Sequence, residues 1–205
     1  MKKPPPYRRS PILHWGRWLF LALGIAALVY VGYSLLDATL FQAYQGLRLD
    51  RALKDAPASP ATLLPSSDPD RRASVARGVA FGRIEISRIG VAVIMVEGTD
   101  EVSLQRAVGH VSGTALPGEQ GNVGIAGHRD TFFRALRNIR QDDDVTLTTI
   151  NGSYRYRVDS IKVVAPENGD VLINSGGSVL TLVTCYPFYF VGSAPKRLIV
   201  RAHLI

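Results

Sequence analysis

One run of strand-forming residues, Val179-Leu180-Thr181-Leu182-Val183-Thr184-Cys185-Tyr186-Pro187, contains the single cysteine of the chain. Its apolar residues 179–183 predict a buried strand. Pro187 predicts the end of that strand, because proline lacks the N–H that a strand ladder needs and restricts φ. We therefore expect the thiol of Cys185 at the mouth of a strand, where a nucleophile is accessible. Elsewhere, a lone cysteine is usually a small and inert buried residue.

Short strands at even spacing surround this run. Ile- and Val-rich or alternating segments predict strands over 83–96 (two strands with a turn at Gly90), 121–126, 145–150, 154–164, 179–184 and 198–205. Asn151-Gly152 predicts a tight hairpin turn. Short helical segments are expected over 101–108 and 131–138. Many short strands and few helices favour a mostly β fold, a closed or nearly closed barrel.

The last two predicted strands bring two reactive groups together. Only residues 186–196 separate Cys185 from Arg197, so antiparallel pairing would make them neighbours at one rim of the barrel. On the last strand Leu198, Val200, Ala202 and Leu204 alternate with Arg197, Arg201 and His203. The apolar set must face the core, which turns Arg197 outward. A cation there can stabilise a thiolate or an oxyanion, although a plain exposed arginine is the simpler interpretation.

A proton carrier is the third group that such chemistry needs. His128 follows the segment 121–127, where glycines permit a tight turn, and His110 follows Val108-Gly109. Histidine suits proton transfer near neutral pH. Spacing alone ranks neither histidine above the other.

The formal net charge of +7 is concentrated at the N-terminus, because five basic and no acidic residues precede residue 18. The remaining chain carries 19 basic and 17 acidic residues, which does not indicate a nucleic-acid-binding face. Residues 18–36 then run for 19 residues without a charge, roughly 28 Å of helix, enough to cross a bilayer. The basic flank predicts a cytoplasmic N-terminus and an extracytoplasmic remainder.

These patterns predict four parts of the chain. They are a basic cytoplasmic tail (1–17), a transmembrane helix (18–36), a juxtamembrane helix with a Pro-rich linker (37–77) and a folded extracytoplasmic domain (78–205). A cleaved signal peptide is the alternative for the apolar run. The anchor is favoured because the run exceeds a usual signal h-region and no small-x-small cleavage site follows it.

Three motifs together resemble the sortase family, and most of all its class D. They are Gly124-Ile125-Ala126-Gly127-His128-Arg129, then Thr181-Leu182-Val183-Thr184-Cys185, then Arg197, over a similarity that covers residues 78–205. The resemblance implies a closed barrel of about eight strands behind an N-terminal membrane anchor. It also implies that Cys185, His128 and Arg197 are catalytic, and that Thr184, Tyr186 and Pro187 contact substrate.

The resemblance further implies a reaction and its partners. A sortase-like enzyme cleaves an LPxTG-like sorting signal between Thr and Gly through a thioester on the cysteine. It then transfers the substrate protein to an amine of peptidoglycan or of its lipid-linked precursor. Such an enzyme lies in the plasma membrane with a single pass, and no cofactor, metal or nucleic acid is expected.

Several alternatives stay open beside this interpretation. A pilin-polymerising sortase often carries an Asp-Pro-aromatic lid, whereas Asp68-Pro69-Asp70 lacks the ring. A peptidoglycan L,D-transpeptidase is disfavoured because Thr184, not glycine, precedes the cysteine. A non-catalytic extracytoplasmic β-domain that binds envelope partners is the alternative from another class. The run Asp142-Asp143-Asp144 lacks the spacing of a calcium loop.

Overall fold

The computed structural model of the chain describes residues 11–55, 76–173, 176–190 and 192–205. It contains two compact units, Met1–Thr39 and Leu40–Ile205. One helix, α1 (Pro11–Asp55), runs through both. The basic tail before residue 11 and the Pro-rich segment 56–75, with Asp68-Pro69-Asp70, lie outside the described residues.

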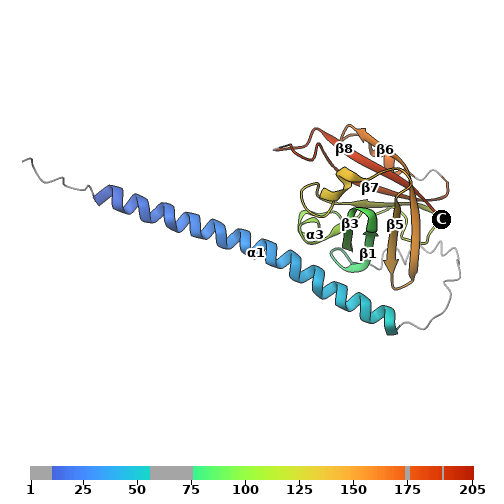
Figure 1. The fold of residues 1–205 in the computed structure, drawn as a ribbon, viewed down its shortest axis with the longest axis horizontal. Coiled ribbons are helices and arrows are strands. Elements are labelled where there is room, and N and C mark those ends of the chain that lie inside the picture. The colour runs from blue at the N-terminus through green and yellow to red at the C-terminus, as the bar shows by residue number, and fades with distance from the viewer. Residues whose placement is uncertain (1–10, 56–75, 174–175, 191) are drawn as a thin grey trace, which may run out of the picture. The chain divides into compact units, whose positions relative to one another are not determined.

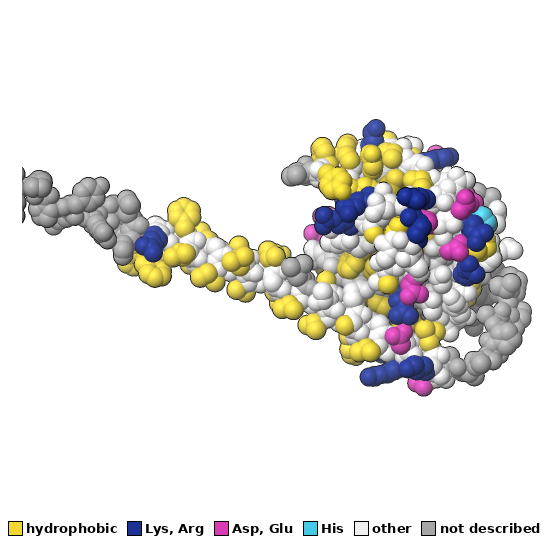
Figure 2. Space-filling model, viewed as in Figure 1, with side chains coloured by type: hydrophobic (Ala, Val, Ile, Leu, Met, Phe, Trp, Pro, Cys, Tyr) yellow, Lys and Arg dark blue, Asp and Glu magenta, His cyan; other side chains and the backbone are white. Residues whose placement is uncertain are grey.

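Exposed apolar side chains follow one another along the N-terminal part of α1, and those on the viewed face are visible in Figure 2. Among the described residues, α1 is the one helix long and apolar enough to cross a membrane, judged by length and composition. The predicted apolar N-terminal helix is thus confirmed. Its insertion in a membrane and its orientation stay predictions, because a signal sequence has the same character.

The second unit is a closed barrel of eight strands, as predicted (Figure 1). The strands are β1 (Ala80–Ile86), β2 (Val91–Glu97), β3 (Val108–His110), β4 (Gly121–Ala126), β5 (Asp144–Thr149), β6 (Gly152–Val164), β7 (Ser178–Tyr186) and β8 (Lys196–Leu204). They close in the order β1-β2-β3-β4-β7-β8-β6-β5. The pairs β2–β3 and β4–β7 are parallel, and the other pairs are antiparallel.

The interior of the barrel is filled by side chains from alternate positions of the strands. Ile84 and Ile86 of β1, Leu180 and Leu182 of β7, and Val200 of β8 are buried in one apolar cluster, which also includes Tyr156 and Phe133. Because strand side chains alternate between faces, the residues between these point out of the barrel. Outward-facing residues at the strand ends are therefore the ones that substrate could reach.

Short elements connect the strands. The short helix α3 (Glu101–Arg106) falls within the predicted segment, and Asp100 caps it by accepting from the Ser103 N–H at 3.1 Å. The 3-10 helices are η1 (Ser87–Ile89), η2 (Arg134–Asn138) and η3 (Gly169–Leu172). The strand β3 was not predicted, because three residues show no periodicity.

The C-terminal end of α1 belongs to the same compact unit as the barrel. Leu49 is buried in a small apolar cluster with Ile94, Val96 and Ala107. Gln42 donates from Nε2 to the Arg106 carbonyl at 2.7 Å, and its Oε1 accepts from the Ile94 N–H at 2.9 Å. The predicted juxtamembrane helix thus supplies side chains that pack against β2 and the end of α3.

Candidate active site

Cys185 lies at the end of β7, one residue before the strand ends at Tyr186. Pro187 follows, so the predicted stop is confirmed. Leu180, Leu182 and Thr184 are buried and alternate with Cys185, which places the sulfur on the outer face of the barrel. Cys185 is a free, half-buried thiol. It is therefore not enclosed in the core as an inert cysteine would be.

Arg197 is the register partner of Cys185 across the antiparallel pair β7–β8. The two residues share the outer face, as the sequence predicts, while Leu198 and Val200 are buried. Arg197 Nη1 donates to the carbonyls of Ala194, at 3.2 Å, and Lys196, at 3.1 Å. A guanidinium has five N–H donors, so these two bonds use only part of its capacity.

His128 is held near the same rim by its neighbour Gly127. The Gly127 N–H donates to the Val183 carbonyl at 3.1 Å, and Thr184 Oγ1 donates to the Gly127 carbonyl at 2.7 Å. The parallel register pairs Ala126 with Val183, so the chain reaches His128 beside the last residues of β7. His128 itself is half-buried. Three strands, β4, β7 and β8, thus bring the three predicted residues to one rim.

Gly127 is required at this point by close packing. A Cβ there would lie 2.8 Å from the Phe133 ring and 3.0 Å from Val108. Since real Cβ atoms avoid such approaches, any larger residue would displace the segment that carries His128. The Phe133 N–H donates to the His128 carbonyl at 3.0 Å and fixes the turn from the other side.

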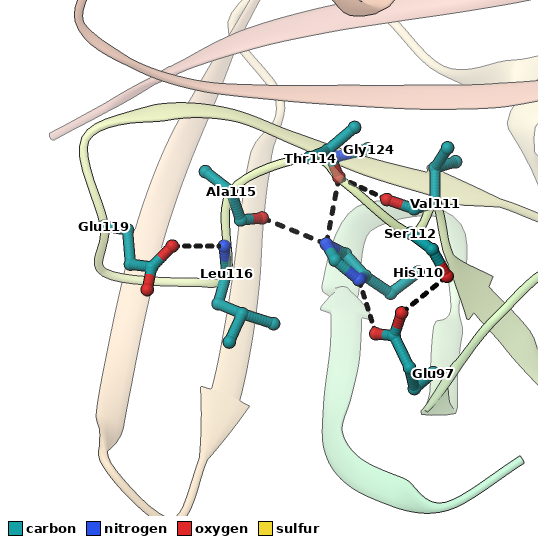
Figure 3. A network of polar contacts seen from close by, with 9 residues as sticks. All are labelled: Glu97, His110, Val111, Ser112, Thr114, Ala115, Leu116, Glu119 and Gly124. Carbon is teal, nitrogen blue, oxygen red and sulfur yellow. Dashed lines mark hydrogen bonds and ion pairs between the residues drawn. The ribbon is translucent and has the colours of Figure 1, made fainter. Parts of the chain in front are cut away.

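His110 is enclosed by a polar network instead (Figure 3). It is 2% exposed. Its Nδ1 lies 2.6 Å from Glu97 Oε2, and its Nε2 lies 3.0 Å from the Ala115 carbonyl. Ser112 Oγ donates to the second Glu97 oxygen at 2.7 Å. Both ring nitrogens are thus occupied within the protein.

The partners of His110 determine where its protons are. A carbonyl oxygen only accepts, so Nε2 carries a hydrogen. Nδ1 and the Glu97 carboxyl share the shortest contact of this network, at 2.6 Å. Thr114 extends it: its hydroxyl donates to the Val111 carbonyl at 2.7 Å and accepts from the Gly124 N–H at 3.1 Å. His110 therefore fastens the connection between β3 and β4.

The residues predicted to contact substrate fall into two groups. Thr184 is buried, and its hydroxyl is bonded to Gly127 under the rim. Tyr186 and Pro187 are half-buried where β7 ends, and the Tyr186 ring packs edge-on against Phe188 at 6.2 Å. Arg129 has no role assigned from the sequence, yet its side chain donates to the carbonyls of Pro187, Phe190 and Gly192. Its position next to His128 was the only available signal.

Two aspartates with a lowered pKa, Asp143 and Asp144, pair with arginines. Hydrogen bonds from Arg88 hold the pKa of Asp143 below its usual range, and bonds from Arg157 do the same for Asp144. Burial raises the pKa of Tyr156 to about 12. No three His, Cys, Asp or Glu side chains among the described residues form a group that could hold a metal ion.

Known proteins are similar to this chain in sequence and in fold. A Sortase domain model matches residues 84–205. Sortase D of Bacillus subtilis is 31% identical over 88% of this chain and 92% of its own length. The structure of a Clostridium perfringens Sortase D5 transpeptidase has a TM-score of 0.60 and 28% identity, and covers 77% of this chain and 98% of that one. A Clostridium perfringens sortase C, solved with the C-terminal cell wall sorting motif, has a TM-score of 0.58 and 29% identity over 64% of this chain and 74% of that one.

Proposed function

Because this chain belongs to the sortase family of cysteine transpeptidases, we propose that it cleaves an LPxTG-like sorting signal between Thr and Gly and transfers the substrate protein to a cell-wall amine. The observation that carries the proposal is the pairing of Cys185 with Arg197 on the outer face of the barrel, with His128 tied to the same rim through Gly127. A nucleophile, a cation and a proton carrier are what acyl transfer through a thioester requires.

The first half of the reaction forms the acyl-enzyme. The Cys185 thiolate attacks the Thr carbonyl carbon, a C–S bond forms, and negative charge develops on the carbonyl oxygen. The guanidinium of Arg197 stabilises that charge or holds the substrate backbone. The C–N bond then breaks, and the His128 imidazolium gives its proton to the leaving glycine amine.

The second half releases the product. The acceptor amine attacks the thioester carbonyl carbon, and the neutral His128 takes the proton that the amine loses. A new C–N bond forms, the C–S bond breaks, and Cys185 leaves as a thiolate. Water follows the same route at the thioester and gives hydrolysis as a slow side reaction.

The enclosed position of His110 supports His128 as the proton carrier. The ring nitrogens of His110 are already bonded to Glu97 and Ala115, whereas His128 is half-buried at the rim. Tyr186 and Pro187 are proposed to line the sorting-signal site. For Thr184 the proposed role is to hold the Gly127-His128 segment beneath the substrate.

The same proposal gives the chain an uncleaved membrane anchor. The basic residues that precede α1 favour a cytoplasmic N-terminus, and the barrel is then on the extracytoplasmic side, where cell-wall amines lie. Substrate proteins with a C-terminal sorting signal would meet the enzyme at the membrane surface. The acceptor is peptidoglycan or its lipid-linked precursor.

The test uses the full chain in detergent micelles. It is incubated with peptides that carry LPxTG-like pentapeptides, together with triglycine, a diamino acid peptide or a pilin-type lysine peptide as acceptor. Mass spectrometry is expected to find cleavage after Thr and a new amide to one acceptor. Cys185→Ala should give neither product, and Arg197→Gln should lower turnover about 10²-fold. Product formation by Cys185→Ala would overturn the proposal. Preferred transfer to the lysine peptide would replace wall anchoring with pilin polymerisation.

A further inference from the structure

Arg129 directs its guanidinium into the segment that connects β7 with β8. Its Nη1 donates to the Pro187 carbonyl at 2.8 Å, and its Nη2 donates to the carbonyls of Phe190, at 2.7 Å, and Gly192, at 3.0 Å. The guanidinium carbon also lies 5.9 Å from the centre of the Phe190 ring. One side chain therefore binds three main-chain oxygens of a segment about 60 residues further along the chain.

This segment joins two of the proposed catalytic residues. It begins one residue after Cys185, at Tyr186, and leads into Arg197 at the start of β8. Tyr189 is 78% exposed and Phe190 is 45% exposed, so core packing does little to hold the middle of the segment. Polar anchors are therefore expected to decide its position.

The two anchors come from the stretch that follows His128. Arg129 is the first, and Arg137 of η2 is the second, with Nη1 donating to the Tyr189 hydroxyl at 2.9 Å. The Arg137 guanidinium also lies over the Tyr189 ring at 5.8 Å. The residues that follow His128 are thus bonded to the segment that connects Cys185 with Arg197.

A lysine could not make the same contacts. A guanidinium presents donors in a planar fork, so its two terminal nitrogens reach carbonyls on both sides at once. An ammonium is a point charge on a flexible stem, and it would satisfy fewer of these three oxygens in one geometry. Gly192 contributes its carbonyl with φ at 97°, in a region that favours glycine.

We propose that Arg129 is a positioning residue that holds the β7–β8 segment as a preformed wall of the substrate site. This rests on the proposed function, because it names how the same site receives the sorting signal. Arg129 acts through the segment and not on the reacting atoms. Its loss should weaken binding of substrate more than it slows the chemical step.

The experiment compares Arg129→Gln and Arg129→Lys with the wild-type full chain in micelles. Arg134→Gln is the matched control, because Arg134 is an exposed arginine of the nearby helix η2. Amide hydrogen exchange is measured for peptides from the 186–196 segment, with peptides of β4 and β6 as internal references. We expect both Arg129 variants to exchange about tenfold faster in the segment alone. KM for a sorting-signal peptide should rise about tenfold, while kcat stays within about threefold.

Three results would overturn the positioning role. One is Arg129→Lys matching the wild type in both exchange and KM, since a single cation would then suffice. Another is unchanged exchange in the segment for both Arg129 variants. The third is a fall in kcat with KM unchanged, which would place Arg129 in the chemistry. If the wild type cleaves no peptide, the proposed function fails, and the exchange measurement still decides whether Arg129 holds the segment.

Discussion

Two histidines of this chain occupy opposite kinds of site. His110 ends the short strand β3, is 2% exposed, and has both ring nitrogens bonded within the protein. His128 follows the end of β4, is half-buried, and stands at the rim that carries Cys185 and Arg197. In the sequence each follows a Gly-containing segment, so spacing alone ranks neither above the other, and the choice of His128 came from the resemblance to sortases.

The difference shows what a proton carrier needs besides an imidazole. A histidine whose two nitrogens are satisfied internally must break bonds before it can exchange a proton with substrate. The hydrogen bonds of the His110 network hold the connection between β3 and β4 in place. We therefore expect the network to stabilise the fold and not to take part in the reaction. The rim around His128 leaves the ring accessible and fixes only the backbone beside it. Each variant below tests one side of this contrast.

The largest expected effect is on activity at the rim. Replacing His128 with Ala should lower kcat/KM for a sorting-signal peptide about 10³-fold, because the proposed mechanism assigns protonation of the leaving amine to His128. The melting temperature, followed by circular dichroism, should change little. His110→Ala, assayed below its own unfolding transition, should keep most of the activity. Comparable losses of activity in the two variants would show that the contrast is wrong.

A loss of stability is expected when the closed network is broken. Glu97→Gln removes the carboxylate that faces His110 Nδ1 and the Ser112 hydroxyl. The amide of Gln has one acceptor oxygen where the carboxylate has two, so the His110 N–H and the Ser112 hydroxyl cannot both donate to it, and a buried donor left unsatisfied costs about 1–3 kcal/mol of unfolding free energy. Urea denaturation should therefore shift to a lower midpoint, whereas Glu167→Gln, at an exposed position, should not shift it. An unshifted midpoint for Glu97→Gln would remove the structural role assigned to the network.

Thr184→Val tests the link between the two strands at the rim. The variant keeps the shape of a buried side chain but leaves the Gly127 carbonyl without its 2.7 Å donor. The unfolding free energy should fall by about 1–2 kcal/mol. Since His128 is attached to Gly127, kcat/KM should also fall, by about tenfold. Thr184→Ser, which retains the hydroxyl, should recover most of the activity; if it does not, the hydrogen bond is not what matters.

The smallest effect concerns the acid stability that the Arg88–Asp143 pair provides. Arg88 holds the pKa of Asp143 below its usual range, so the stabilisation from this carboxylate is fully present above the unfolded value of about 4 and is lost as the pH falls through the lower folded value. Because Arg88 is 40% exposed, solvent screens the pair and its contribution to stability is small. Melting temperatures of the wild type and Asp143→Asn should differ at pH 7 and converge below pH 4. If the difference in melting temperature persists at low pH, the Arg88–Asp143 pair is not its cause.

The sequence was informative wherever a pattern extends over several residues. The apolar alternation of β8 predicted the outward side of Arg197, and Pro187 predicted the end of β7; together they predicted the Cys185–Arg197 pairing. Tertiary partners were not predictable in the same way. The Glu97–His110 contact joins residues 13 apart across a parallel strand pair, and the three carbonyls bound by Arg129 belong to a segment without periodicity. Both sets of contacts form between parts of the chain that come together only when the barrel closes, so no local sequence pattern predicts them.

The most direct test of the central claim is the mass of the enzyme during the reaction. The full chain in micelles is mixed with a sorting-signal peptide, quenched in acid within the first turnover, and digested for mass spectrometry. We predict that the acyl fragment ending in Thr is attached to the peptide that contains Cys185 and that hydroxylamine releases this fragment. His128→Ala should slow formation of the acyl-enzyme, whereas His110→Ala should not. Turnover without any acyl group on Cys185, or an acyl group on another residue, would contradict the account.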